Sequence, residues 1–216
     1  MNPSTAPLTL YTADTPNGLK VSLYLHEASL AYRQVNVDLS AGEQKRPEFL
    51  RMNPNGKIPV IVDHERDLTL FESGAILTYL AQKTGVLQPM TQAKALAVDQ
   101  WLHFQIGGIG PILGQLWWFI HASRTGNREA IERYCKESLR LMGVVEARLA
   151  QSAYLATDEY SIADIAAFAW LRTHHELALD VTPFPHMRRW LAQIEARPAV
   201  QSAIVANRGQ ASLRQA

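Results

Sequence analysis

Residues 8–18 read LTLYTADTPNG, and this stretch decides the first part of the fold. The apolar run Leu8 to Thr12 predicts a strand, and a helix is expected to begin near Leu19. A strand that turns into a helix presents unpaired backbone N–H groups and the positive end of the helix dipole, which favour an anion such as a thiolate. The hydroxyl of Thr15 and the amide of Asn17 are suitable donors to it. The turn contains no cysteine, so a sulfur nucleophile at this turn must arrive on a ligand.

The same turn also has a purely structural interpretation, in which Asn17 caps the helix and Pro16 stiffens the turn. The chain has a single cysteine, Cys135. An intramolecular disulfide, a multi-cysteine metal site and a Cys-x-x-Cys motif are therefore excluded. Cys135 lies in the strongly helical stretch 129–149, where a lone cysteine is more often a packed side chain than a nucleophile.

Composition excludes several classes of function. The chain has 216 residues, 47% of them hydrophobic, and a net charge of +1 with acidic and basic residues interspersed. Nucleic-acid binding normally needs a clustered basic face, so it is set aside. No secretory signal and no run long enough to cross a bilayer is present, which predicts a cytoplasmic protein. The histidines and carboxylates show no metal-site spacing, so no metal is expected.

Strand and helix signals alternate in the first third of the chain. The predicted order is a strand at 8–12, a helix at 19–29 and a strand at 32–37, then, after a polar loop-like stretch, strands at 59–63 and 68–71 and a helix at 73–84. A βαβ unit followed by a ββα unit describes a small mixed sheet with helices packed on it. This is an α/β domain of the thioredoxin type.

Strand signals almost vanish in the rest of the chain, which predicts an all-α domain. The predicted helices span 93–122, 129–152, 161–179, 185–196 and 199–207. Gly107-Gly108 and Gly110-Pro111 predict a kink or break within the first of these helices. The expected domains are 1–86 and 92–216, joined by a linker at 87–91.

The segment Ser161 to Asp164 has the pattern of a capping box with aspartate in place of glutamate. We assign these residues to folding rather than to catalysis, and expect a loss of about 1 kcal/mol on replacing Asp164.

Two further segments of the first domain carry candidate binding residues. Pro59 starts a predicted strand, where the backbone of Ile58 and Pro59 is free on one side to pair with a peptide-like ligand; otherwise it is an ordinary edge proline. Ser73 is a natural N-cap whose neighbouring amides form an anion site, and Glu72 before it can bind an ammonium group. Together these two residues fit the α-amino acid end of a γ-glutamyl ligand.

Two loop residues, Gln44 and Lys57, flank the same predicted edge. They can supply donors to a second carboxylate of the ligand, although exposed loop lysines are common.

Seven motifs together resemble the glutathione transferase superfamily, and within it the bacterial nu class of glutathione-dependent disulfide-bond oxidoreductases. In this sequence they read TPNG at 15–18, RPEFL at 46–50, NGKIP at 55–59, FESGAI at 71–76, GGIGP at 107–111, AIERY at 130–134 and SIADI at 161–165. The resemblance implies a homodimer with a thioredoxin-like domain that binds glutathione and a helical domain that forms the second-substrate pocket.

The resemblance also implies residue roles. Thr15 and Asn17 would contact the glutathione sulfur, Ile58 and Pro59 the cysteinyl backbone, Glu72 and Ser73 the γ-glutamyl group, and Gln44 and Lys57 the glycyl end. Arg133 matches a helical-domain arginine that reaches glutathione in the dimer.

One departure from the nu-class pattern concerns the second substrate. Leu116-Trp117-Trp118-Phe119 stands where polar residues with paired histidines are expected. We therefore expect a more apolar pocket, with one tryptophan stacking on a ligand and the other packed in the core.

The leading hypothesis is a glutathione-dependent disulfide reductase that uses the thiolate of bound glutathione and no catalytic cysteine. One alternative is a glutathione transferase that conjugates apolar electrophiles beside Trp117 or Trp118. Another is a non-catalytic regulator with the same fold.

Overall fold

A computed structural model describes residues 6–89 and 91–208 of the chain, which form two compact units. The first unit takes the described residues up to Val86 together with those from Arg197 onward. The second unit is Leu87–Ala196. The sequence placed residues 197–208 in the helical domain predicted at 92–216, whereas here they group with the first unit. Residues 1–5 and 209–216 of the predicted domains and residue 90 of the predicted linker lie outside the described residues.

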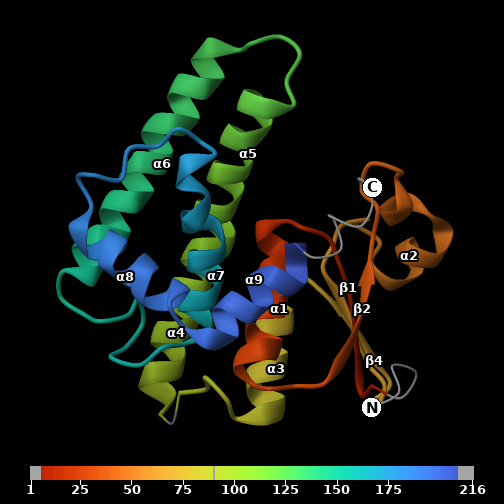
Figure 1. Ribbon diagram of the computed structural model, residues 1–216. Coiled ribbons are helices and arrows are strands. Elements are labelled where there is room, and N and C mark those ends of the chain that lie inside the picture. The colour runs from red at the N-terminus through yellow and green to blue at the C-terminus, as the bar shows by residue number, and fades with distance from the viewer. Residues whose placement is uncertain (1–5, 90, 209–216) are drawn as a thin grey trace. The chain divides into compact units, whose positions relative to one another are not determined.

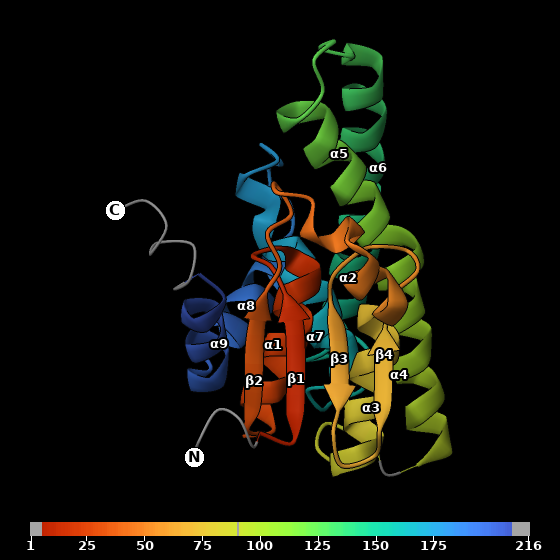
Figure 2. The same ribbon diagram turned by 90° about the vertical axis from the view of Figure 1, so that its right-hand side faces the viewer.

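The first unit is built on a four-stranded sheet of order β2-β1-β3-β4, as Figure 2 shows. Its strands are β1 (Leu8–Thr12), β2 (Tyr32–Asn36), β3 (Val60–Asp63) and β4 (Leu68–Phe71). The pair β1–β2 is parallel, and the pairs β1–β3 and β3–β4 are antiparallel. The mixed sheet of the thioredoxin type predicted from the sequence is confirmed.

Helices cover both faces of this sheet. Helices α1 (Pro16–Glu27) and α3 (Ser73–Thr84) pack together on one face, and α2 (Pro47–Met52) lies on the other (Figure 1). The stretch expected to be loop-like thus contains α2 and the 3-10 turn η2 (Glu43–Lys45). Pro47 fits the first turn of a helix, and Phe49 is buried in a small cluster with Val37 and Val60.

The last helix, α9 (Pro198–Arg208), packs against α1. Arg197 forms a two-pronged ion pair with Glu27 at 2.6 and 2.8 Å. Near the other end of α1, the Asn207 amide donates to Asp14 at 2.8 Å. These contacts and the apolar side of α9 explain why the helix belongs to the first unit.

In the described residues of the second unit, every regular element is a helix or helical turn, as predicted. Its elements are α4 (Gln92–Phe104), η3 (Gln105–Ile109), α5 (Gly110–His121), α6 (Arg128–Leu149), α7 (Ile162–Leu171), η4 (Arg172–His175) and α8 (Pro185–Glu195). The helix predicted at 161–179 is shorter, because α7 ends at Leu171 and gives way to the 3-10 turn η4.

The break predicted in the long helix at 93–122 is confirmed as the π-helical turn η3 between α4 and α5. A Cβ added at Gly110 would lie 2.8 Å from Gln105 Nε2 and 3.3 Å from the Trp170 ring nitrogen. Glycine at this position therefore allows α7 to approach the helix closely.

Helix α7 forms the centre of the second unit, with nearly all its side chains buried. It begins with the predicted capping box, in which Asp164 accepts from the backbone N–H of Ser161 at 3.1 Å. Asp164 also accepts from the Leu155 N–H at 2.9 Å and from the Trp190 ring N–H at 3.0 Å. The carboxylate therefore joins three segments of the chain.

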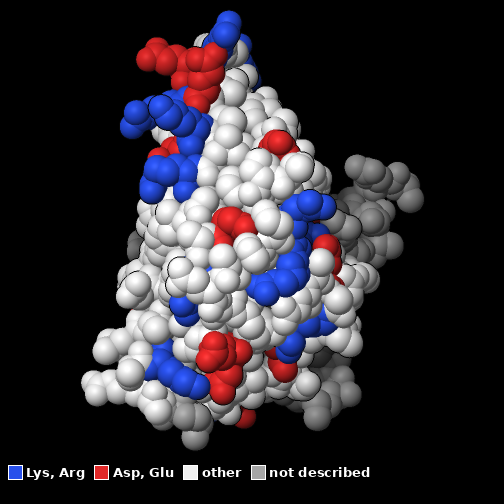
Figure 3. Space-filling model, turned by 90° about the vertical axis from the view of Figure 1, so that its left-hand side faces the viewer, with Lys and Arg blue, Asp and Glu red and all other residues white. Residues whose placement is uncertain are grey.

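The surface shows no large region of one charge on the face drawn in Figure 3, where basic and acidic side chains lie in small mixed groups. Within residues 6–89 and 91–208, no helix is long and apolar enough to span a membrane.

Candidate functional site

The turn between β1 and α1 is built around Thr15 and Gly18. Thr15 is the N-cap of α1, and its hydroxyl oxygen accepts from the Gly18 N–H at 3.1 Å. The oxygen still carries its own hydrogen, so the hydroxyl can donate to an anion. Thr15 therefore caps the helix, the role that the structural interpretation gave to Asn17. Asn17 lies half-buried in the first turn.

A close approach of backbone segments fixes this turn. A Cβ at Gly18 would lie 2.3 Å from Thr12 Oγ1 and 2.4 Å from the Ala13 carbonyl oxygen. Only glycine fits between the end of β1 and the start of α1.

The start of α3 differs from the predicted cap. Glu72, not Ser73, occupies the N-cap position, with φ 70° and ψ 114°. This conformation is uncommon for a residue other than glycine and costs on the order of 1–3 kcal/mol. The Glu72 carbonyl accepts from Ile76 N–H at 2.9 Å, and the Glu72 side chain is exposed. Ser73 is the first residue of the helix, and its hydroxyl accepts from Lys20 Nζ at 3.3 Å.

The loop before β3 carries Lys57, Ile58 and Pro59. The Lys57 side chain is exposed, and its carbonyl accepts from the Asn53 amide at 2.6 Å. The peptide bond between Ile58 and Pro59 is cis. Gln44, on η2, is half-buried and donates to the Leu39 carbonyl at 3.4 Å.

The strand register brings three of these segments to the same end of the sheet. Val60 pairs with Tyr11 of β1 on one side and with Phe71 of β4 on the other. The turn that follows β1, the Ile58–Pro59 segment before β3 and the Glu72–Ser73 segment after β4 therefore leave the sheet at the same end. The hydrogen bond from Lys20 to Ser73 then links α1 to the start of α3.

The chain matches known proteins over both units. The family model "Glutathione S-transferase, N-terminal domain" matches residues 6–82, and "Glutathione S-transferase, C-terminal domain" matches residues 110–198. The Disulfide-bond oxidoreductase YfcG of Escherichia coli (strain K12) is 47% identical over 201 residues, covering 91% of this chain and 94% of that protein. The chain belongs to the glutathione transferase superfamily.

Two solved structures of the superfamily are also similar. A glutathione transferase from Burkholderia graminis, with two glutathione molecules bound per subunit, has a TM-score of 0.88 and 43% identity over 93% of this chain and 88% of that one. The glutathione transferase URE2P6 from Phanerochaete chrysosporium, in complex with oxidized glutathione, has a TM-score of 0.90 and 34% identity over 95% and 98%.

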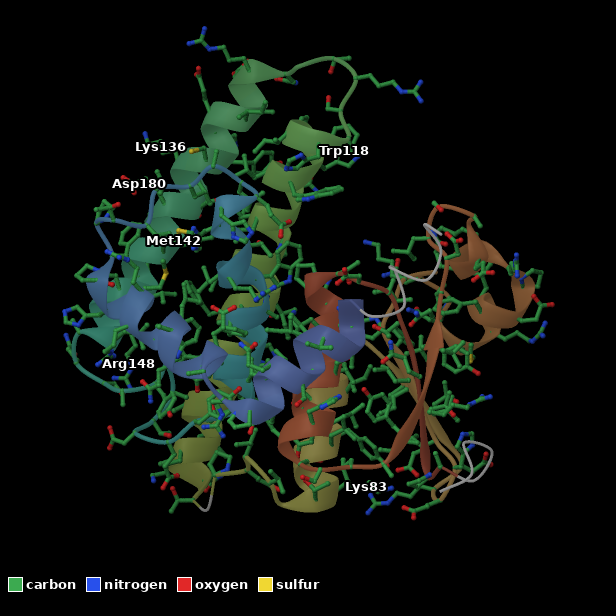
Figure 4. All side chains as sticks on the ribbon, in the orientation of Figure 1. Lys83, Trp118, Lys136, Met142, Arg148 and Asp180 are labelled. Atoms are coloured by element: carbon green, nitrogen blue, oxygen red, sulfur yellow. The ribbon has the colours of Figure 1, made fainter. Side chains whose placement is uncertain are left out.

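The remaining predicted residues of this glutathione transferase lie in the second unit. Trp117 and Trp118, on α5, are 44% and 47% exposed (Figure 4 labels Trp118). The expectation that one of them packs in the core is wrong, because Leu113 and Leu116 already form the buried side of α5. The Trp117 ring lies 5.3 Å from the His121 ring.

Arg133 is exposed on α6. Cys135 lies on the same helix and is half-buried, in the helical setting that the sequence predicted. Among residues 6–89 and 91–208, no group of three or more His, Cys, Asp or Glu side chains is placed to hold a metal ion.

Lys20 is the functional candidate that the sequence interpretation missed. Its side chain is 2% exposed, and burial lowers its pKa to about 7, although the nearby Glu72 carboxylate acts in the opposite direction. The sequence contained a signal for it, because Lys20 falls within the largely apolar run from Leu19 to Leu25. In the structure every residue of this run is buried.

Proposed function

We propose that this glutathione transferase is a glutathione-dependent disulfide-bond reductase in which the thiolate of bound glutathione is the nucleophile. The observation that carries the proposal is the turn at Thr15 to Gly18, which offers donors to an anion at a helix N-terminus and contains no cysteine. The name of the E. coli relative YfcG, a disulfide-bond oxidoreductase, supports the same class of reaction.

The edge of the sheet is suited to glutathione in its extended form. Glu72 would bind the α-ammonium group, and Ser73 with the first N–H groups of α3 would bind the α-carboxylate. The backbone of Ile58, ahead of Pro59, would pair with the cysteinyl residue.

Two loop residues complete the proposed glutathione site. Lys57 and Gln44 would donate to the glycyl carboxylate.

The donors at the turn would stabilise the thiolate. Lowering a thiol pKa from about 8.5 to about 6.5 requires roughly 2.7 kcal/mol of preferential thiolate stabilisation. Hydrogen bonds from the Thr15 hydroxyl and the Asn17 amide, together with the N-terminus of α1, are of the right size to provide it.

The reaction proceeds in two exchanges. The bound thiolate attacks one sulfur of a disulfide, a new S–S bond forms to glutathione, and the original S–S bond breaks. The departing thiolate leaves with the electron pair and takes a proton from water. A second glutathione thiolate then attacks the mixed disulfide, which releases the other thiol and forms glutathione disulfide. The two glutathione molecules bound per subunit in the Burkholderia graminis structure support this stoichiometry.

We further propose a homodimer in which Arg133 binds a carboxylate of glutathione. Arg133 is exposed on α6, and the planar fork of its guanidinium suits a carboxylate.

Conjugation of an apolar electrophile is the second candidate function. The observation that favours it is the pair of exposed indoles at Trp117 and Trp118, which offer aromatic surface to an apolar ligand.

Measurement of both activities of the wild-type protein tests the proposal. We expect glutathione-dependent reduction of a small mixed disulfide, followed through coupled glutathione reductase, to exceed conjugation of an aryl halide. Conjugation far above disulfide reduction would select the second candidate. Glutathione binding without turnover of either acceptor would instead point to a regulator.

A further inference from the structure

Lys20 is a buried lysine at the proposed γ-glutamyl end of the glutathione site. Its side chain is 2% exposed, and its ammonium donates to the Ser73 hydroxyl at 3.3 Å. The bond joins α1 to the first residue of α3, the helix whose N-terminus faces the proposed α-carboxylate. Through this hydrogen bond, Lys20 contacts the segment that carries Glu72 and Ser73.

Burial of this ammonium group is costly, and an apolar side chain of similar length would avoid the cost. Burial lowers the pKa of Lys20 to about 7, and the Glu72 carboxylate opposes this shift. A group with this pKa changes its charge near neutral pH, so an additional negative charge nearby would favour its protonated form.

Three other charged groups near α1 have partners of their own. Glu27 pairs with Arg197 of α9, and Asp14 accepts from Asn207. Lys83, at the end of α3, pairs with Asp63 of β3. The charge of Glu72 raises the pKa of Lys20, against the effect of burial.

We propose that Lys20 is a positioning residue of the glutathione site, which holds Ser73 at the start of α3 and takes up a proton when the α-carboxylate of the ligand binds there. The inference rests on the proposed glutathione site and adds a protonation step to it. Glutathione binding and the charge of Lys20 are linked, so each favours the other.

Calorimetric titration with S-methylglutathione tests this inference, because that ligand has no thiol proton to release. Titrations at about pH 8, in buffers of different ionisation enthalpy, give the number of protons bound with the ligand. At this pH a group with a pKa of about 7 is mostly neutral, so we expect the wild type to take up roughly one proton. Lys20→Met should take up much less and bind about tenfold more weakly.

Two variants serve as controls. Lys20→Arg stays charged, so it should bind S-methylglutathione more tightly than Lys20→Met and without proton uptake. If Lys20→Met does not fold, the proton uptake of Lys20→Arg compared with the wild type tests the role of Lys20. Lys136→Met changes an exposed lysine on α6 and should match the wild type (Figure 4).

Equal proton uptake by the wild type and the Lys20 variants would overturn the role of Lys20 while leaving the glutathione site intact. A wild type that does not bind S-methylglutathione would overturn the proposed site itself, and the Lys20 inference with it.

Discussion

At the scale of single residues, the position that the structure constrains most tightly is Gly18. We expect Gly18→Ala to lower the free energy of unfolding by about 1–3 kcal/mol, because its Cβ would lie 2.3 Å from Thr12 Oγ1 and 2.4 Å from a backbone oxygen. Thermal unfolding should show a fall of about 2–4 °C in Tm for each kcal/mol lost.

Gly143→Ala is the matched control for this substitution. An added Cβ at Gly143, within α6, meets no atom within 4 Å, so the better helix propensity of alanine should stabilise the protein by about 0.5–1 kcal/mol. An equal effect of the two substitutions would contradict the close approach at the turn.

At the scale of elements, Asp164 holds α7 to its neighbours. The sequence predicted a loss of about 1 kcal/mol on its replacement, through capping alone. The structure adds hydrogen bonds from Leu155 and Trp190 to a fully buried carboxylate. We therefore expect Asp164→Ala to cost about 3–5 kcal/mol in urea unfolding, since several buried donors lose their acceptor.

Thr91→Ala is the control for capping alone. Thr91 is an exposed N-cap that accepts from the Lys94 N–H at 3.3 Å, so its loss should cost about 1 kcal/mol. A cost for Asp164→Ala no greater than that for Thr91→Ala would contradict the network.

A second prediction for elements concerns acid stability, through the contact between β3 and α3. Burial would raise the pKa of Asp63, but hydrogen bonds from Lys83, Tyr79 and the Glu65 N–H outweigh burial and hold its pKa below the usual value. A depressed carboxyl pKa adds stability above the unfolded-state value of about 4, and this stability is lost as the pH falls through the folded-state pKa.

The measurement is the free energy of unfolding as a function of pH. Asp63→Asn should be less stable at neutral pH and lose less stability on acidification. Asp67→Asn, in the exposed turn that follows β3, should keep the acid dependence of the wild type. Identical pH profiles for Asp63→Asn and the wild type would exclude this carboxylate as the cause.

At the scale of the whole molecule, local sequence patterns predicted most elements well. The strands and helices of the sheet domain, the break near Gly110 and the capping box at Ser161 are all signalled by patterns of residues close in sequence. The placement of α9 depends on pairs such as Glu27 with Arg197, which lie far apart in the chain, and no local pattern contains them.

The candidate site likewise contains some residues that local sequence patterns identify and some contacts that they do not. Thr15 and Asn17 could be identified from the sequence because a turn motif contains them. The cap at Glu72 and the bond from Lys20 to Ser73 could not, because they arise from a left-handed backbone and from the packing of α1 on α3. The exposure of both Trp117 and Trp118 likewise follows from which side of α5 the core occupies.

The central claim is that the reacting sulfur belongs to glutathione and not to the protein. The most direct measurement is glutathione-dependent reduction of a small mixed disulfide by the wild type, Cys135→Ser and Asn17→Ala. We predict that Cys135→Ser retains the wild-type rate. Asn17→Ala should lose about tenfold or more, because one hydrogen bond to the thiolate is removed. Loss of activity in Cys135→Ser, with full activity in Asn17→Ala, would contradict this account.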